Sequence, residues 1–552
     1  MTNATTGSDR IVPGQQPPAG ERSPLLARLV RPAVTHWQFA IVALGAIVAR
    51  IIVVLGYPPI LWFNDSYNYV YDAVSHVPDE VRPNGYPLFL DLVLPLHSAY
   101  PLALLQAAMG IVMGVAIYAL LRHRGLPWWG ASLPALPVLF DSYELHLEHM
   151  VTADPLFIFL VTIAVVVLCW SDRPSLAVTA IAGLLIGYAA LVRSVGEPLL
   201  LVVLVGLLAR RVGWRRLAAV LVAGIVPIAA YMFWFHASTG KYALTESSGT
   251  FLYGRVSTFA ECAKIKPPAD LQVLCDPTPP NLRPVAGEYI WADNELGPDP
   301  ATTPLWRLYR SGDTALRFGP ATNGLTEKFA KDAILAQPVA YLRVVTDDTL
   351  HTFGWNRQPD PNDYAGNGPA FQFVSGSEIN SLIPWWAGPQ SPAKYAQWMS
   401  IPGQRTDVVA RQTYAARQDL GGPGAGGTRV VAPWARLLQI YQRYIYLRGT
   451  LLGIIVLIGV AGVLARWRRW GGIGLLPWLV GALLIILPPM TAGFSYRYAI
   501  AAVPTACLAA GLAFARRPGE KSVRALTADL RRHFGRGAAV EEECRGAAVE
   551  EE

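Results

Sequence analysis

The sequence predicts an α-helical membrane protein that crosses the bilayer about ten times. Only 15% of the 552 residues are charged, whereas soluble proteins average about 25%. Hydrophobic residues make up 53% of the chain, and many stand in runs close to the length of about 20 residues that a transmembrane helix needs. Ten such runs lie near 37–56, 101–121, 127–144, 153–170, 175–192, 195–209, 215–235, 444–465, 471–490 and 497–515.

The basic residues predict that both chain ends lie in the cytoplasm. Loops rich in Lys and Arg stay on the cytoplasmic side of a membrane, and here they alternate with loops that lack them. The basic loop residues are Arg122, Arg124, Arg173, Arg210, Arg211, Arg215, Arg216, Arg466, Arg468 and Arg469. An arm, 1–34, and a basic and then acidic tail, 516–552, fall on the same side. We expect the arm and the acidic end of the tail to be disordered.

The opposite side of the membrane receives two outer loops, 57–100 and 141–152, and one long segment, 236–440. This segment separates the seventh run from the eighth and is far longer than ordinary connections. We therefore expect it to fold as a mixed extracytoplasmic domain. It divides the membrane part into a catalytic module, 35–235, and C-terminal transmembrane helices, 441–515.

Two features stand out within the expected outer domain. The stretch 327–355 has apolar residues at helical spacing. Such a helix either lies along the membrane surface or is buried inside the domain, and both interpretations stay open. Cys262 and Cys275 lie on the oxidising side of the membrane, where a disulfide between them is expected.

Charged residues gather at the outer ends of the predicted spans. A charge at membrane depth costs about 2.5–3.5 kcal/mol on insertion scales, so its presence points to function. The residues that share this side are Asp65, Asp72, Asp141, Glu144, Glu148, His149, Asp154, Arg193, Glu197, Lys241 and Arg497. Because they come from several apolar segments, we expect a polar cleft at the outer boundary of the bilayer.

Asp65 is the candidate general base. It follows the first span, between Asn64 and Ser66. Asp is also a favoured N-cap residue, here for a helix over 66–74. The residues alone leave both interpretations open.

Glu148, His149 and Asp154 are candidates for orienting a substrate hydroxyl or for holding a divalent cation. Asp154 precedes Pro155 and equally suits a cap of the fourth span. The spacing of these residues is not that of a zinc site. A site of oxygen ligands for magnesium or calcium stays open.

Arg193 and Arg497 are the candidate anion ligands, because a guanidinium group pairs with two phosphate oxygens. The alternative is that these side chains snorkel to the interface, and Arg50 in the first span either snorkels or pairs inside the bundle. The sequence has no Walker loop, GxSxG elbow, HExxH motif or dinucleotide fingerprint. We therefore expect a lipid-linked donor that is reached from outside, and no nucleic-acid partner.

Several motifs, in order along the chain, resemble those of the family 39-like glycosyltransferases, the C-type membrane transferases that use polyprenyl-phosphate donors. The motifs are FNDSYNY (63–69), RPNGYPLFL (82–90), MVTADPLFIFL (150–160), LVRSVGEPLLLV (191–202), AILAQPVAYLRVV (333–345) and SYRYAIAAVP (495–504). The resemblance implies the C-type architecture and an inverting transfer from a polyprenyl-phosphate sugar to an acceptor hydroxyl. Many relatives carry an acidic pair where this chain has Asp65–Ser66, so the resemblance does not imply a metal requirement.

The resemblance also implies roles for individual residues. Asp65 would deprotonate the acceptor, and Arg193 and Arg497 would bind the donor phosphate. Lys241, from the same outer cluster of charges, is a further candidate for binding that phosphate. The residues that would contact the sugar of the donor or the acceptor are Asn64, Tyr67, Glu148, His149 and Asp154.

The composition, rich in Ala, Arg, Gly and Val, is similar to that of actinobacterial cell-envelope members of this group. This similarity implies the plasma membrane, a sugar that is arabinofuranose or mannose, and a glycan, lipid or protein acceptor. Two other classes stay open, a transporter or flippase of polyprenyl-linked lipid and a non-catalytic envelope-assembly protein. The chain shows no clear internal repeat of the kind that is common in transporters.

Overall fold

The computed structural model describes residues 36–291, 304–305, 318–356, 372–376, 406–422, 427–466 and 472–515. Within these ranges the regular secondary structure is helical, and the helices are joined by loops and turns, with an isolated bridge between Leu61 and Met150. The expected arm, 1–34, and tail, 516–552, lie outside the described residues. The prediction of a polytopic α-helical membrane protein is confirmed.

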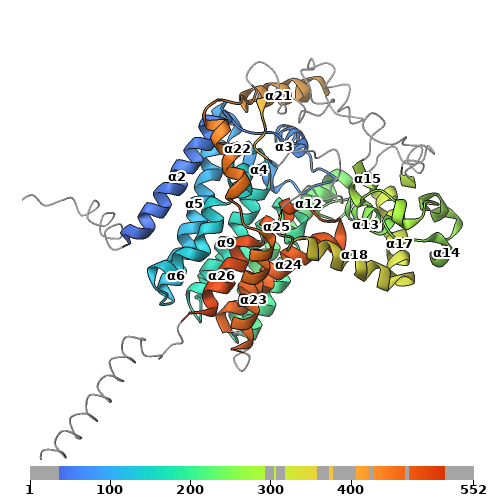
Figure 1. Cartoon of the computed structure of the whole chain (residues 1–552). Helices are drawn as coiled ribbons and strands as arrows, with labels where there is room; N and C mark the ends of the chain where they lie inside the picture. Colours follow the sequence, from blue (N-terminus) through green and yellow to red (C-terminus); the bar gives the residue numbers. More distant parts are fainter. Residues whose placement is uncertain are drawn as a thin grey trace, which may run out of the picture.

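The long apolar helices form one bundle (Figure 1). Five described helical units are long and apolar enough to cross a membrane: α2 (Trp37–Gly56), α5 (Tyr100–His123), α12 (Trp214–Thr239), Gly472–Thr491 and Tyr496–Ala513. The fourth of these contains α24 (Leu475–Thr491), and the fifth contains α25 (Tyr496–Ile500) and α26 (Val503–Ala513). A sixth unit is α22 (Trp434–Tyr444) with α23 (Gly449–Leu464), if the 55° bend between them falls within one span.

The remaining predicted runs form shorter apolar helices. These helices are α6 (Trp128–Ser132), α7 (Leu136–Phe140), α9 (Asp154–Trp170), α10 (Leu176–Val192) and α11 (Leu199–Ala209). The third run is divided into α6 and α7 around Pro134 and Pro137, because a proline lacks the backbone N–H that a continuous helix uses. Each predicted run is therefore found as an apolar helix or helix pair, in the predicted order.

Helices α10 and α12 approach closely because small residues line their contact. A Cβ atom on Gly183 would lie 2.4 Å from the carbonyl oxygen of Val220. One on Gly187 would lie 2.2 Å from the carbonyl oxygen of Gly224. Glycines allow the two backbones to pack at this distance, as they do in many membrane proteins.

Short helices cover one end of the bundle (Figure 1). They are α3 (Asn64–Ser75), α4 (Gly85–Asp91) and α8 (Ser142–Glu148). Helix α21 (Thr406–Asp419) packs on α3. At the opposite end, Arg124 pairs with Asp172 at 2.8 Å, and Arg210 donates to the carbonyl of Ser171 at 2.6 Å. The basic loops and the outer loops thus lie at opposite ends of the bundle.

The described part of 248–356 forms a lobe beside the bundle, whereas α21, from the same 236–440 segment, packs on α3 (Figure 1). Its helices are α13 (Ser248–Ser257), α14 (Cys262–Ile265), α15 (Ala286–Trp291), α17 (Pro320–Ala336) and α18 (Pro338–His351). Tyr253, Leu271 and Phe329 are buried in its core. Where the sequence suggests a mixed domain, these described residues form helices and loops without a strand, consistent with their helical spacing of apolar residues. The predicted disulfide joins Cys262 and Cys275, whose Cα atoms are 5.9 Å apart.

The predicted helix near 327–355 is two helices, because Pro338 separates α17 from α18. Helix α17 packs into the lobe. Helix α18 leaves Val339, Leu342 and Leu350 at least 60% exposed. For α18, this exposed apolar face agrees with the interpretation that the helix lies along the membrane surface. The alternative, burial inside the lobe, describes α17.

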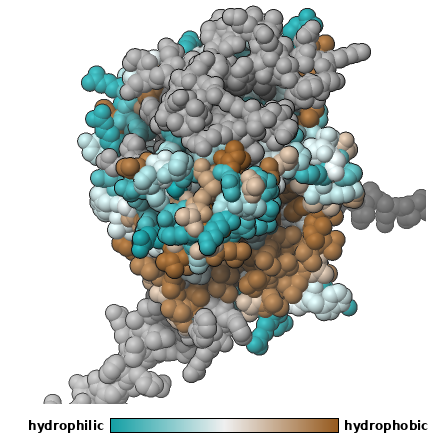
Figure 2. All heavy atoms as spheres, turned by 90° about the vertical axis from the view of Figure 1, so that its right-hand side faces the viewer, coloured by the Kyte–Doolittle hydropathy of each residue, from teal (hydrophilic) through white to brown (hydrophobic). Residues whose placement is uncertain are grey.

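A hydrophobic zone surrounds the bundle. Figure 2 shows hydrophobic side chains gathered in the lower part of the face on which the lobe lies, below a hydrophilic zone. On α2, the exposed apolar side chains include Leu44, Ile47, Ile51 and Leu55. An apolar surface of this extent is expected where a protein contacts lipid.

Candidate active site

Asp65 lies in the first turn of α3. The N-cap of this helix is Phe63, and the hydroxyl of Ser66 closes the turn. That hydroxyl accepts a hydrogen bond from the N–H of Phe63 at 2.9 Å and donates one to the carbonyl of Val151 at 2.7 Å. The capping interpretation of Asp65 is therefore wrong, because Ser66 performs this function and the Asp65 carboxylate faces other groups.

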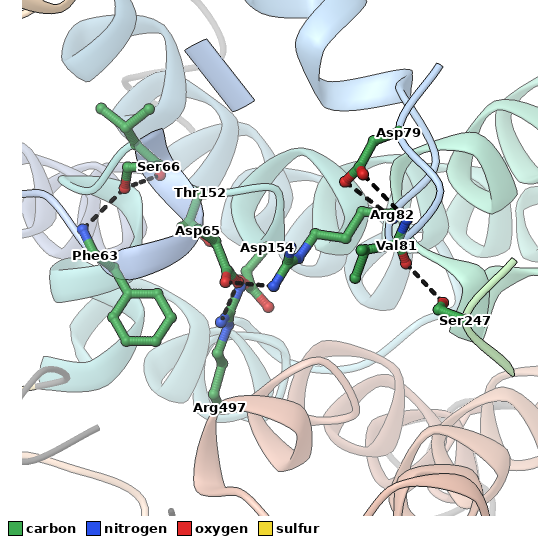
Figure 3. A network of polar contacts seen from close by, with 11 residues as sticks. Phe63, Asp65, Ser66, Asp79, Val81, Arg82, Thr152, Asp154, Ser247 and Arg497 are labelled. Atoms are coloured by element: carbon green, nitrogen blue, oxygen red, sulfur yellow. Dashed lines mark hydrogen bonds and ion pairs between the residues drawn. The ribbon is translucent and has the colours of Figure 1, made fainter. Parts of the chain in front are cut away.

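Both carboxylate oxygens of Asp65 are bound by guanidinium groups (Figure 3). Arg82 Nη2 donates to Oδ1 at 2.7 Å, and Arg497 Nη1 donates to Oδ2 at 3.0 Å. Arg82 lies in the same outer loop as Asp65, between α3 and α4, whereas Arg497 reaches Asp65 from α25, on the other side of the carboxylate. The Asp65 side chain is 13% exposed, so the site is sheltered but not sealed.

Arg497 connects Asp65 to a second carboxylate. Its Nε donates to Asp154 Oδ2 at 2.7 Å, and its Nη2 donates to the hydroxyl of Thr152 at 3.0 Å. That hydroxyl donates to the same Asp154 oxygen at 2.7 Å. The other oxygen of Asp154 pairs with Arg193. Asp154 begins α9 without a side-chain capping bond, so its partners are these side chains.

The five residues Arg82, Asp65, Arg497, Asp154 and Arg193 form one continuous chain of ion pairs, which we call the Asp65 network. Three guanidinium groups and two carboxylates leave it with a net charge of plus one. Arg82 Nη1 is buried and has no hydrogen-bond partner. The network therefore has both the charge and a spare donor for binding an anion.

Aromatic rings support the three guanidinium groups of the network. The distances from guanidinium carbon to ring centroid are 5.5 Å for Arg82 and Trp291, 5.3 Å for Arg497 and Phe63, and 5.2 Å for Arg193 and Tyr498. Stacking on a ring fixes the plane of a guanidinium group and suits its charge. The donors are thus held in place before a ligand arrives.

The pKa of Asp65 is lowered. Burial by itself would raise the pKa of this carboxyl, but the positive charges of Arg82 and Arg497 outweigh burial and bring it below its usual value. Asp65 is therefore ionised at neutral pH. It becomes a stronger base when one of the arginines turns to another anion.

Arg82 is the network residue to which the sequence assigned no role. It begins the RPNGYPLFL motif, and this motif is the signal that could have identified it. The carboxylate of Asp79 accepts hydrogen bonds from the N–H groups of Val81 and Arg82 at 3.1 and 3.2 Å, which shapes the loop (Figure 3). Thr152 was also missed, because its partners are set by packing.

The structure does not bring Lys241 into the network. Its ammonium group lies 3.6 Å from Glu246, and the side chain is 47% exposed. Lys241 follows the end of α12, and its long stem leads to solvent and not to Asp65. The role of Lys241 at the donor phosphate stays a prediction.

Glu148 and His149 also face away from the network. Glu148 accepts a hydrogen bond from Arg50 at 2.6 Å inside the bundle, and His149 Nε2 lies 2.8 Å from the carbonyl oxygen of Tyr57. Arg50 therefore pairs inside the bundle, one of the two expectations for it. Burial, opposed by Arg50, raises the pKa of Glu148 to about 7. Burial lowers the pKa of His149 to about 4.

Asn64 and Tyr67 lie on α3 with Asp65. Asn64 is half-buried at the start of the helix. The Tyr67 ring is buried, 5.1 Å from the ring of Trp62 and 4.5 Å from the guanidinium carbon of Arg417 near the end of α21. Asn64 is close enough in sequence to serve a ligand at Asp65, whereas Tyr67 mainly packs against α21.

A divalent cation has no evident set of ligands in the part of the chain that the structure describes. These residues contain no group of three or more His, Cys, Asp or Glu side chains arranged for a metal. The two carboxylates of the network, Asp65 and Asp154, already bind guanidinium groups. The arrangement fits an anion better than a cation.

No protein-family model matches the chain, and no curated protein matches it. Among solved structures, the chain is similar to the S. cerevisiae protein O-mannosyltransferase Pmt1-Pmt2 complex bound to the sugar donor, with 17% identity and a TM-score of 0.30. The match covers 40% of this chain and 35% of that chain, so it spans about a third of the yeast protein.

Proposed function

We propose that this protein is an integral membrane glycosyltransferase that moves a sugar from a polyprenyl-phosphate donor to an acceptor hydroxyl. The observation that carries the proposal is the Asp65 network. It places an ionised carboxylate between two guanidinium groups and links it to a third, with a net positive charge at the end of the bundle that carries the outer loops. The motif resemblance supports the same reaction.

The reaction has one base and one anionic leaving group. The acceptor oxygen forms a bond to the anomeric carbon while its proton passes to Asp65. The bond from that carbon to the phosphate oxygen breaks, and its electron pair stays on the polyprenyl phosphate. A single attack from the face opposite the phosphate inverts the configuration at the anomeric carbon.

The guanidinium groups stabilise the departing phosphate. Arg193 is 17% exposed and presents its remaining donors to the surroundings, while Arg82 has a buried free donor. Hydrogen bonds from charged donors to a phosphate are about twice as strong as neutral ones, and preorganised donors contribute most in a site with little water. An anion that draws Arg497 from Asp65 also raises the pKa of Asp65 and makes it a better base.

We further propose that the active site faces the outside of the plasma membrane and that both termini are cytoplasmic. The basic loops share the end of the bundle opposite the Asp65 network, which agrees with the positive-inside rule. From the resemblance, the sugar is arabinofuranose or mannose, and the acceptor is a glycan, a lipid or a protein.

The test is the variant Asp65→Asn in the full chain, purified in detergent. Wild-type protein is incubated with polyprenyl-phosphate arabinose or mannose and an envelope extract as acceptor, and products are identified by mass. We expect Asp65→Asn to lose turnover by about 10²–10⁴-fold, the usual contribution of a general base, and to keep donor binding. Asp91→Asn is the control, because Asp91 lies on neighbouring α4 with its side chain 42% exposed.

The outcomes separate the candidate functions. Equal turnover of Asp65→Asn and wild type contradicts the assignment of the base. Transport of labelled lipid across vesicles without a new glycosidic product favours a flippase, and neither activity favours an assembly protein. The same assay with a chelator decides whether a divalent cation takes part.

A further inference from the structure

The N-terminal end of α13 is hydrogen-bonded to the loop that carries Arg82. The hydroxyl of Ser247, which precedes the helix, donates to the carbonyl of Val81 at 2.9 Å (Figure 3). The N–H of Glu246 donates to the carbonyl of Glu80 at 2.7 Å. The two residues before Arg82 are thus tied to the outer lobe.

The other end of α13 contacts the turn that leads to Arg497. Arg255 lies in the last turn of α13 and pairs with Asp348 of α18, and both side chains are 5% exposed. Gly493 precedes Arg497 by four residues and has φ of +147°, which favours glycine. A Cβ there would lie 3.5 Å from the Cβ of Ala286 and 3.8 Å from Arg255 Nη1.

Helix α18 holds the same turn from a second direction. The hydroxyl of Tyr341 donates to the carbonyl of Met490 at 3.0 Å, at the end of α24. The ring of His351 lies 5.9 Å from that of Phe494. The turn between α24 and α25 therefore rests on α13, α15 and α18 together.

A fully buried ion pair is a costly way to join two helices, because taking the charges out of water offsets most of their attraction. Its geometry is restrictive, however, since each partner left alone would be a buried unpaired charge. The Arg255–Asp348 pair therefore constrains the angle between α13 and α18. Helix α13 has 10 residues, and such a helix is about 15 Å long, so it bridges the two loops as a short rigid rod.

We propose that α13 is a spacer that sets the positions of Arg82 and Arg497 on either side of Asp65, with Arg255, Asp348 and Ser247 as its positioning residues. This proposal rests on the proposed function, because its consequence is a donor-phosphate site that is assembled by the outer lobe. None of the three positioning residues contacts the carboxylate of Asp65 in the described contacts. They act through the loops that carry the two arginines.

The experiment compares Asp348→Asn and Ser247→Ala with wild type, using the full chain in detergent. Farnesyl phosphate serves as the soluble probe of the phosphate site, and steady-state kinetics use the polyprenyl-phosphate sugar. We expect Asp348→Asn to weaken probe binding and to raise the donor KM by about ten-fold or more, since displacements near 1 Å can cost up to about 10²-fold. The loss in kcat should be smaller. Asp348→Glu keeps the charge and should restore most of the affinity.

Lys331→Gln is the matched control, because Lys331 pairs with Glu327 in the same lobe but is 64% exposed. It should bind the probe like wild type. Ser247→Ala loses one hydrogen bond to the Arg82 loop and should raise the donor KM less than Asp348→Asn does. If Asp348→Asn fails to fold, Ser247→Ala alone tests the proposal. An unchanged donor KM in this variant would then overturn the assignment of α13 as a spacer.

Two failures are distinguishable. If Asp65→Asn abolishes turnover while folded Asp348→Asn and Ser247→Ala bind farnesyl phosphate like wild type, the spacer is wrong and the proposed function stands. If Asp65→Asn keeps wild-type turnover, the proposed function itself is wrong. The spacer proposal then falls with it, because the donor-phosphate site that α13 would assemble is no longer supported.

Discussion

The Asp65 network and the Arg50–Glu148 pair are both buried arrangements of charge, yet they are built differently. The network has one more guanidinium group than carboxylates, and Arg82 and Arg193 keep 19% and 17% of their side-chain surface exposed. The pair has one group of each sign, at 6% and 2% exposure. A Cβ on Gly110 would lie 1.7 Å from Glu148 Oε1, so the helix α5 closes over the pair.

We infer that this difference separates a candidate site from a packing contact. The partly exposed guanidinium groups of the network can meet an incoming anion, whereas the Arg50–Glu148 pair is enclosed and cannot. Both contain residues that the sequence marked as functional. We therefore expect a charge at membrane depth to serve a function where the tertiary structure leaves it partly exposed and not fully paired.

After Asp65→Asn, the largest effect is expected for Arg497→Lys. Lysine keeps the charge but loses the planar fork that joins Asp65, Thr152 and Asp154. We expect kcat/KM to fall by about 10²–10³-fold, the range seen when a preorganised transition-state donor is lost. Arg50→Lys is the matched control and should lower the melting temperature while leaving kcat/KM per folded molecule unchanged. Loss of activity in folded Arg50→Lys would erase the distinction between the two regions.

Gly110→Ala should act on stability alone. The added methyl group must displace the Arg50–Glu148 pair, and overpacking of this kind costs about 1–3 kcal/mol. We expect a lower melting temperature and normal turnover in the molecules that remain folded. Gly324→Ala is the control, because a Cβ on Gly324 of α17 meets no atom within 4 Å. Replacing a helical glycine by alanine in open space should stabilise by about 0.5–1 kcal/mol.

The two regions should respond to pH with opposite signs. Burial, opposed by Arg50, raises the pKa of Glu148 from 4.5 to about 7. The folded protein then holds this proton more tightly than the unfolded chain, so stability falls as the pH rises from 4.5 to about 7. For Asp65, burial is outweighed by Arg82 and Arg497 and the pKa is lowered, so its contribution is present above 3.8 and is lost as the pH falls through the folded pKa.

Melting temperatures of wild type and Glu148→Gln between about pH 5 and 8 measure this difference. Glu148→Gln should lose the fall in stability across the interval in which Glu148 titrates. An identical pH profile in both proteins would contradict the buried, proton-binding state of Glu148. The profile at lower pH, where Asp65 acts, should be the same in both proteins.

The smallest effect is expected for Lys241→Gln. The side chain is half-exposed and meets Glu246 at 3.6 Å, and exposed ion pairs contribute about 0–1 kcal/mol. We expect donor KM and melting temperature to stay near wild type, with a change of about two-fold or less in KM. A large rise in donor KM would support the sequence-based assignment of Lys241 to the phosphate site.

Much of the fold could be predicted because it depends on neighbours in sequence. Apolar runs, alternate basic loops and two cysteines 13 positions apart are local patterns. The runs predict the spans, the basic loops predict which end of the bundle each loop lies at, and the cysteines predict the disulfide. The break at Pro338 is equally local. Asp65, Arg193 and Arg497 could be named as candidates because charge is costly at membrane depth wherever the chain goes.

By itself, then, the sequence determined where the helices lie and which charged residues stand at their outer ends. Only the tertiary structure decided which charges meet. Asp65 pairs with Arg497, 432 positions away, while Glu148 pairs with Arg50 and Lys241 turns to solvent. The physical reason is that hydropathy acts along a single helix, whereas the partner of a charge is chosen by the close approach of segments that share no local pattern.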